Sequence, residues 1–157
     1  MKIFPAIDIK DKKCVRLVRG DFDNKTEYET SPIDQAGKYK DHGFKNLHIV
    51  DLDGALTGNT VNLDIIQEIV SKYDLNIEVG GGVRSIDSIK KYVDSGVEKI
   101  ILGSAAIKNK EFLKEACTKF KKKIALGLDA KDGNLSVSGW KENLNTKTSD
   151  FLKEVND

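Results

Sequence analysis

Two aspartates end apolar segments at matching places in the chain and could work together as an acid and a base. Asp8 lies near the end of the apolar residues 2–9, one position before Ile9, and Asp129 is the last of the apolar residues 123–129. Two carboxyl groups in one pocket move their pKa values apart, so that one is protonated while the other is ionised. This suits a reaction that transfers protons. The alternative is that each aspartate only ends its strand and caps a turn.

The surroundings of the two aspartates repeat. Residues 7–15 and residues 128–137 both contain Asp-x-Lys-Asp after an apolar strand, and both continue into a second extended segment. The four residues alone are a common turn composition. Because the flanking strand and hairpin repeat too, with four strand–helix units between the copies, the fifth strand is expected to be a second copy of the first. In a closed eight-stranded barrel, strands one and five lie opposite each other, so Asp8 and Asp129 would face each other across its mouth.

Two glycine-bearing loops follow the third and fourth expected strands. Gly81 and Gly82 precede Arg84, and Gly103 precedes Ser104. Backbone amides at such loops and at the following helix termini can hold a phosphate, and an arginine adds a planar cationic fork. The alternative is that the glycines only meet steric demands. The spacing is not that of the dinucleotide fingerprint.

Three further residues are candidates for supporting or binding roles. Asp51 follows a strand end and is ranked as supporting, although Asp-Leu-Asp-Gly could equally be a helix-entry turn. Arg19 lies in the long first loop. Such a loop often covers a bound substrate, and the alternative is that it is an ordinary solvated loop. Trp140 either stacks on a planar ligand or fills an apolar gap. His42 and His48 have no partners at ligand spacing and are expected to be structural.

Strands and helices must alternate five times to position these residues. Strands are expected at residues 2–9, 46–51, 76–79, 99–103 and 123–129, with a second extended segment at residues 14–18. The first helix is expected to begin at Pro32, with Ser31 as its N-cap, and to be closed by Gly43. Further helices are expected at residues 62–73, 86–95, about 110–120 and about 150–156, with loops at residues 19–30 and 52–58. The strands read as apolar on both faces, which is typical of a parallel sheet covered by crossover helices. Both an open doubly wound sheet and a closed barrel satisfy this pattern, and the repeated segment favours the barrel.

The composition indicates one globular domain, residues 1–157. The chain is 39% hydrophobic and 32% charged, with a net charge of +1. Its lysines are mixed with acids, so neither nucleic-acid nor membrane binding is indicated. No apolar run is long enough to cross a bilayer and the start does not resemble a signal peptide, so a cytoplasmic location is expected. Cys14 and Cys117 lack partners at ligand spacing, and neither a metal site nor a disulfide is expected.

Five segments together resemble a known enzyme family, the histidine-biosynthesis isomerases acting on phosphoribosylformimino-5-aminoimidazole carboxamide ribotide (ProFAR). The segments are Phe-Pro-Ala-Ile-Asp-Ile at 4–9, Val-Arg-Leu-Val-Arg-Gly-Asp-Phe at 15–22, His-Ile-Val-Asp-Leu-Asp-Gly-Ala at 48–55, Val-Gly-Gly-Gly-Val-Arg at 79–84 and Leu-Gly-Ser-Ala-Ala at 102–106. The cyclase subunit of imidazole glycerol phosphate synthase is related, but its first two strand motifs differ. A dual-substrate isomerase that also takes phosphoribosylanthranilate is a further alternative.

The resemblance implies a (β/α)8 TIM barrel and an Amadori rearrangement of an aminoaldose phosphate to an aminoketose phosphate, with no cofactor and no metal. Asp8 would accept the proton from the sugar C2, and Asp129 would donate one to assist ring opening. Gly81, Gly82, Arg84, Gly103 and Ser104 would bind one substrate phosphate. Trp140 would lie near the aminoimidazole ring.

The chain departs from this family in length. Members are barrels of about 240 residues, near the usual size of the fold. This sequence is expected to end after about five strand–helix units, which leaves out the second phosphate site and exposes two strand edges. Activity of the 157-residue polypeptide is therefore in doubt. A non-catalytic half-barrel module that self-associates through open edges is the alternative from another functional class.

Overall fold

The computed structural model describes residues 1–18, 20–137 and 142–156. The strands are β1 Ala6–Lys10, β2 Lys13–Val18, β3 Asp21–Glu27, β4 Asn46–Asp51, β5 Asn76–Gly80, β6 Lys99–Leu102, β7 Ile124–Leu126, β8 Asp129–Lys131, β9 Asn134–Val137 and β10 Glu142–Lys147. They form a seven-stranded sheet in the order β3-β2-β1-β4-β5-β6-β7 and a three-stranded sheet in the order β10-β9-β8. In the described part of the chain, no helix is long and apolar enough to cross a membrane.

Several of the helices begin where the sequence supplies a capping side chain. They are α1 Pro32–Asp41, α2 Leu52–Thr57, α3 Leu63–Lys72, α4 Ile86–Asp94, α5 Ser104–Lys108, α6 Lys110–Lys119 and α7 Thr148–Asn156. Ser31, Ser85 and Asn109 each accept a hydrogen bond from a backbone N–H in the first turn of the helix that follows. These bonds satisfy N–H groups that the helix itself leaves unpaired.

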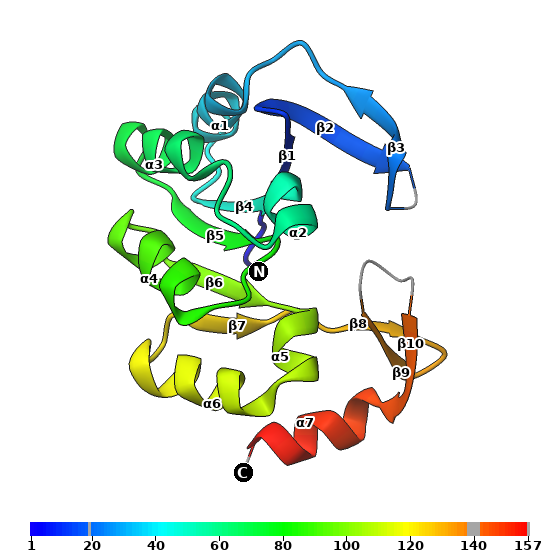
Figure 1. The fold of residues 1–157 in the computed structure, drawn as a ribbon. Coiled ribbons are helices and arrows are strands. Elements are labelled where there is room, and N and C mark those ends of the chain that lie inside the picture. Colours follow the sequence, from blue (N-terminus) through cyan, green and yellow to red (C-terminus); the bar gives the residue numbers. More distant parts are fainter. Residues whose placement is uncertain (19, 138–141, 157) are drawn as a thin grey trace.

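The order of the parallel strands separates the two arrangements that the sequence left open. Each parallel strand pairs with the one before it, from β1 through β4, β5 and β6 to β7. Helices α1, α3, α4 and α6 lie together on one side of the sheet (Figure 1). A doubly wound sheet instead reverses its strand order and carries helices on both faces. The sheet therefore has the order of the first five strands of an eight-stranded parallel barrel.

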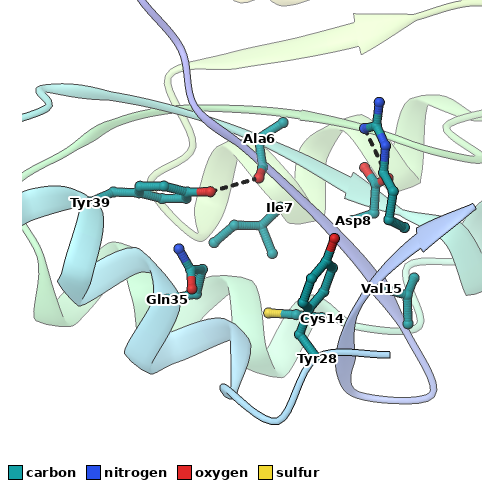
Figure 2. Close-up of a pocket in the computed structure, with 9 residues that line it drawn as sticks. Ala6, Ile7, Asp8, Cys14, Val15, Tyr28, Gln35 and Tyr39 are labelled. Carbon is teal, nitrogen blue, oxygen red and sulfur yellow. Dashed lines mark hydrogen bonds and ion pairs between the residues drawn. The ribbon is translucent and has the colours of Figure 1, made fainter. Parts of the chain in front are cut away.

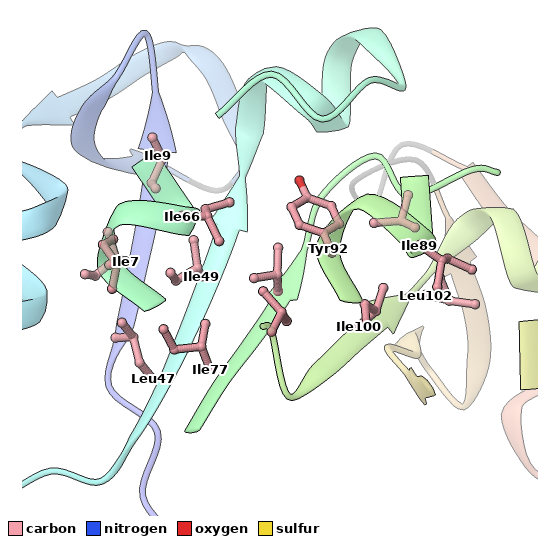
Figure 3. Close-up of a cluster of buried hydrophobic side chains, with 14 of the residues drawn as sticks. Ile7, Ile9, Leu47, Ile49, Ile66, Ile77, Ile89, Tyr92, Ile100 and Leu102 are labelled. Carbon is pink, nitrogen blue, oxygen red and sulfur yellow. The ribbon is translucent and has the colours of Figure 1, made fainter. Parts of the chain in front are cut away.

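The two faces of this sheet differ in chemistry. Isoleucine, leucine and valine side chains of alternate strand positions are buried beneath the helices. Figure 3 shows them between the strands and Ile66 of α3 and Tyr92 of α4. The opposite face carries Asp8, His48 and Glu78, which are only half-buried. The expectation that the strands are apolar on both faces is thus wrong, because every second position faces the polar side.

The repeated segment forms two equivalent hairpins. Asp8 pairs with Val15 in the β1–β2 hairpin, and Asp129 pairs with Ser136 in the β8–β9 hairpin. Both two-residue turns have positive φ angles, at 50° and 63° for Asp11 and Lys12 and at 53° and 79° for Asp132 and Gly133. Positive φ at both central residues matches the turn type that suits twisted two-stranded ribbons.

Several elements differ from the sequence expectation. The first loop contains β3, a polar edge strand whose pairing with β2 sets its conformation. The loops after β4 and β6 contain the short helices α2 and α5. The fifth strand is only Ile124–Leu126, since the chain leaves the large sheet before Asp129 and enters the small one. The small sheet packs on α7 through a second apolar cluster built around Leu135, Val137 and Phe151.

Candidate functional site

Asp8 lies on the polar face of β1, between β2 and β4. Its side chain is 16% exposed, and its Oδ2 lies 3.8 Å from Nη1 of Arg16. Burial raises the pKa of the Asp8 carboxyl above its usual 3.8, while the charges of Arg16 and His48 lower it by less. A half-buried carboxyl with a raised pKa is suited to accept and return a proton.

His48 and Glu78 form a pair that sequence reasoning missed. His48 Nδ1 lies 2.7 Å from Glu78 Oε1, and both side chains are about a quarter exposed. His48 pairs in register with Ala6 of β1, so it lies two residues before Val50, the residue of β4 opposite Asp8. Part of the signal was present, because His48 and Glu78 alternate with the buried residues of β4 and β5. That the two side chains meet and share the face of Asp8 follows from the strand register.

A cavity of about 340 Å³ lies along β1, and Asp8 is one of the residues that line it. Tyr39 and Gln35 reach into it from α1, and the hydroxyl of Tyr39 donates to the Ala6 carbonyl at 3.4 Å. Figure 2 shows Tyr39 at one end and Asp8, with its ion pair, at the other. Among the described residues, β1 pairs with β2 only from Asp8 to Lys10. The cavity therefore follows the unpaired part of the β1 edge.

Asp129 lies three residues beyond the end of β7, as the first residue of β8, and is exposed. The carboxyl ends of β1 and β7 are on the same edge of the sheet because the intervening strands are all parallel. Asp8 and Asp129 therefore share an edge, with β4, β5 and β6 between their strands. Among the described side chains, no hydrogen bond or ion pair joins the two, so their pairing stays a prediction.

Gly81 and Gly82 are required by close packing against the preceding loop. Their φ angles are 105° and 72°, and a Cβ atom on Gly81 would lie 2.2 Å from the Asp51 carbonyl oxygen. A Cβ atom on Gly82 would lie 1.7 Å from the Gly54 carbonyl oxygen. The structure therefore supports the alternative that these glycines meet a steric demand. Their role in phosphate binding stays a prediction.

Arg84 is exposed and turned toward α2. Its Nη2 donates to the Ala55 carbonyl at 2.6 Å. It also lies against Gly58, which ends α2 with a φ of 79°. A guanidinium carries five N–H donors, so this contact leaves donors for an anion.

Gly103 and Ser104 stand where β6 meets α5, beside the loop that carries the two glycines. Gly103 precedes the helix and its carbonyl accepts from the N–H groups of Ala106 and Ile107, at 3.0 and 3.3 Å. Ser104 is the first residue of α5. Because β5 and β6 are neighbours, the two loops leave adjacent strands at one edge of the sheet.

Asp51 is fully buried and organises the corner between β4 and two helices. It accepts hydrogen bonds from the Gly54 N–H at 2.8 Å, the Asn62 side-chain amide at 2.7 Å and the Tyr92 hydroxyl at 3.3 Å. Burial, followed by the Asp51 charge, raises the pKa of Tyr92 and keeps that hydroxyl a donor. Asp51 caps α2, so the helix-entry reading of this segment is correct.

Two candidates, Arg19 and Trp140, lie outside the described residues. Among the residues that are described, no cluster of three or more His, Cys, Asp or Glu side chains is placed to hold a metal ion. Cys14 is buried and Cys117 exposed, and both are free thiols.

Comparison with known proteins gives one family and consistent relatives. The family model described as "Histidine biosynthesis protein" matches residues 2–157. A protein of Pelagibacter ubique (strain HTCC1062) is 85% identical over 157 residues, which are 100% of this chain and 66% of that protein. Proteins of Clostridium kluyveri (strain ATCC 8527) and Halothermothrix orenii are 48% and 45% identical over 155 and 156 residues, 99% of this chain in both cases and 65% and 66% of those proteins.

All three relatives carry the name 1-(5-phosphoribosyl)-5-((5-phosphoribosylamino)methylideneamino) imidazole-4-carboxamide isomerase. The chain thus spans just under two thirds of the length of these curated relatives. The match runs along all five strand–helix units and includes both repeated hairpins.

Proposed function

Because the chain belongs to the histidine biosynthesis protein family, whose fold is the TIM barrel, we propose that its residues encode an isomerase for the ribotide named in its relatives. The reaction is the Amadori rearrangement of the aminoaldose ProFAR to an aminoketose. The observation that carries the proposal is the 85% identity to the Pelagibacter isomerase along all 157 residues. The strand order supports the fold on which that activity depends.

In this reaction Asp8 is the base and Asp129 the acid. Asp129 protonates the ring oxygen as the sugar ring opens to a protonated imine, and Asp8 then takes the proton from C2 to give an enol. Asp8 returns that proton to C1 while the enol hydroxyl gives its proton to Asp129, which forms the ketose, restores both carboxyl groups and leaves no atom gained or lost. The raised pKa of the Asp8 carboxyl supports this role, since a stronger base forms when the proton leaves.

One substrate phosphate is proposed to bind over the adjacent β5 and β6 loops. Gly81, Gly82, Gly103 and Ser104 supply backbone amides and a hydroxyl there, and Arg84 supplies unused N–H donors. Arg19 and Trp140 are proposed to bind the rest of the substrate. The partner is therefore a small bisphosphorylated ribotide, and we place the reaction in the cytoplasm, where small-molecule biosynthesis is usual.

The test is a chimera in which residues 1–157 are joined to the remaining third of the Pelagibacter ubique protein, beside the 157-residue chain itself. Turnover of the aminoaldose ribotide by the chimera is expected, and Asp8→Asn should lower kcat by about 10²–10⁴-fold. Asp41→Asn, an exposed carboxylate at the end of α1, is the matched control and should leave kcat unchanged. A chimera without turnover, or an Asp8→Asn variant at normal rate, contradicts the proposal.

A second candidate function rests on the sheet edges. In the described residues, β7 pairs only with β6, and β1 has a cavity along its unpaired edge. Open edges of this kind associate. We therefore also propose that the 157-residue chain forms oligomers that have no catalytic activity. An oligomer without turnover in the same assay would favour this second function.

A further inference from the structure

The turn between β1 and β2 is fastened to the corner between α2 and α3 by side chains. The Asp11 N–H donates to Asp53 Oδ2 at 2.8 Å, and Lys10 Nζ lies 4.0 Å from Asp53 Oδ1. Lys12 and Asp64 form a further pair at 2.9 Å, but both are more than 60% exposed. Exposed pairs contribute little, whereas the Asp53 side chain is only 15% exposed. The main anchor of the turn is therefore Asp53.

Asp53 is in turn held by Asn62, which is fully buried. The Asn62 Nδ2 donates to Asp53 Oδ2 at 2.9 Å and to Asp51 Oδ1 at 2.7 Å. Its Oδ1 has no hydrogen-bond partner among the described atoms. An unpaired buried oxygen costs free energy. The amide nevertheless keeps this orientation, because turning it would place its oxygen against the carboxylates of Asp51 and Asp53. Asn62 thus fixes the direction in which Asp53 reaches the turn.

The anchored turn controls a hairpin arm, defined here as β2 and β3. In the described part of the chain, strand pairing joins the arm to β1 at three positions, from Asp8 to Lys10, and Cys14 of β2 packs in the main core. Figure 1 shows it reaching away from the layer formed by α1, α3, α4 and α6. It carries Arg16, which lies beside Asp8. The position of this cation at the proposed base therefore depends on how firmly the turn is held.

We propose that Asp53 and Asn62 are positioning residues for Asp8, because they lock the β1–β2 turn and so keep Arg16 beside the proposed base. The inference rests on the role proposed for Asp8, whereas the contacts that hold the turn do not depend on that role. Loss of the anchor lets the arm move and takes the Arg16 charge away from Asp8 for part of the time. Since that charge lowers the Asp8 pKa, the pKa should rise when the anchor is removed.

The test is a carboxyl-carbon NMR titration of Asp8 in the 157-residue chain, together with amide hydrogen exchange. Asp53→Ala should raise the Asp8 midpoint and speed exchange of the Asp11 amide roughly tenfold, the factor expected for loss of one hydrogen bond to a charged group. Asp53→Asn keeps an oxygen that can accept from Asp11 and should restore both values. If Asp53→Ala does not fold, Asp53→Ser, which has a shorter side chain, carries the same two measurements.

Two controls separate positioning from general loss of stability. Ser85→Ala removes the cap of α4, and Asp64→Asn removes the exposed pair with Lys12. Both should leave the Asp8 titration unchanged. An Asp8 midpoint that Asp53→Ala moves no further than Ser85→Ala does would overturn the proposal. Neither measurement uses turnover, so failure of the isomerase assay and failure of this inference are distinguishable.

Discussion

The carboxyl group of Asp8 combines partial burial with a neighbouring cation, and burial has the larger effect on its pKa. A carboxyl whose pKa is raised by folding binds its proton more tightly in the folded chain than in the unfolded one. The stability that this provides is fully present below the ordinary value of 3.8 and is lost as the pH rises through the folded pKa. The proposed base therefore destabilises the chain at neutral pH.

Asp8→Asn should accordingly stabilise the chain at pH 7. The side chain keeps its size and loses its ionisation, so the gain should fall toward zero when the pH is lowered to about 3, below both pKa values. Urea unfolding of the two proteins at both pH values measures the difference. A gain of equal size at both pH values would show that ionisation of Asp8 is not its cause.

The candidate site was only partly readable from the sequence. Asp8 was predicted near the end of an apolar strand, and it lies one residue before the last β1–β4 pair, although β1 itself runs on to Lys10. His48 was assigned a structural role because its partner, Glu78, lies thirty residues away and meets it only through the register of β4 and β5. Arg16 became a partner of Asp8 through the β1–β2 pairing, which local residue types do not fix.

Among the elements, α2 depends most on its neighbours. It has six residues, contains Gly54 and is held by the Asp51 cap and by the loop after β5. Because glycine disfavours helix formation, a sequence-based prediction would not place a helix in so short a segment. The longer elements α1, α3, α4 and β4 were predicted within one or two residues because caps and apolar periodicity agree there.

Gly82→Ala should displace α2 and cost more than about 4 kcal/mol of unfolding free energy, in the range reserved for severe disruption. The new Cβ would lie 1.7 Å from the Gly54 carbonyl oxygen, in addition to the positive φ. Gly133→Ala is the matched control, since its φ is 79° and nothing lies within 4 Å of the new atom. It should cost only about 1–2 kcal/mol. Equal costs in urea denaturation would contradict the proposed clash.

For the whole molecule, the same strand order that identifies the barrel leaves β7 at an edge of the large sheet. Ile100 donates to the Lys123 carbonyl and Gly127 donates to the Leu102 carbonyl, so the backbone of Ile124 and Leu126 faces outward. Such N–H and C=O groups are free to pair with a second chain.

The 157-residue chain should therefore associate as its concentration rises, as analytical ultracentrifugation would measure. Ile124→Pro removes an outward N–H without removing a bond to β6, and should weaken association. A chain that stays monomeric at all concentrations would contradict the second candidate function and leave the isomerase proposal untouched.

The stepwise pairing of neighbouring strands also bears on how the polypeptide is made. Each parallel strand joins the one completed just before it, so its partner has already left the ribosome when it emerges. No finished segment has to open to admit a later one. Assembly during synthesis can thus proceed in one direction, from the strand that bears Asp8 toward the segment that bears Asp129.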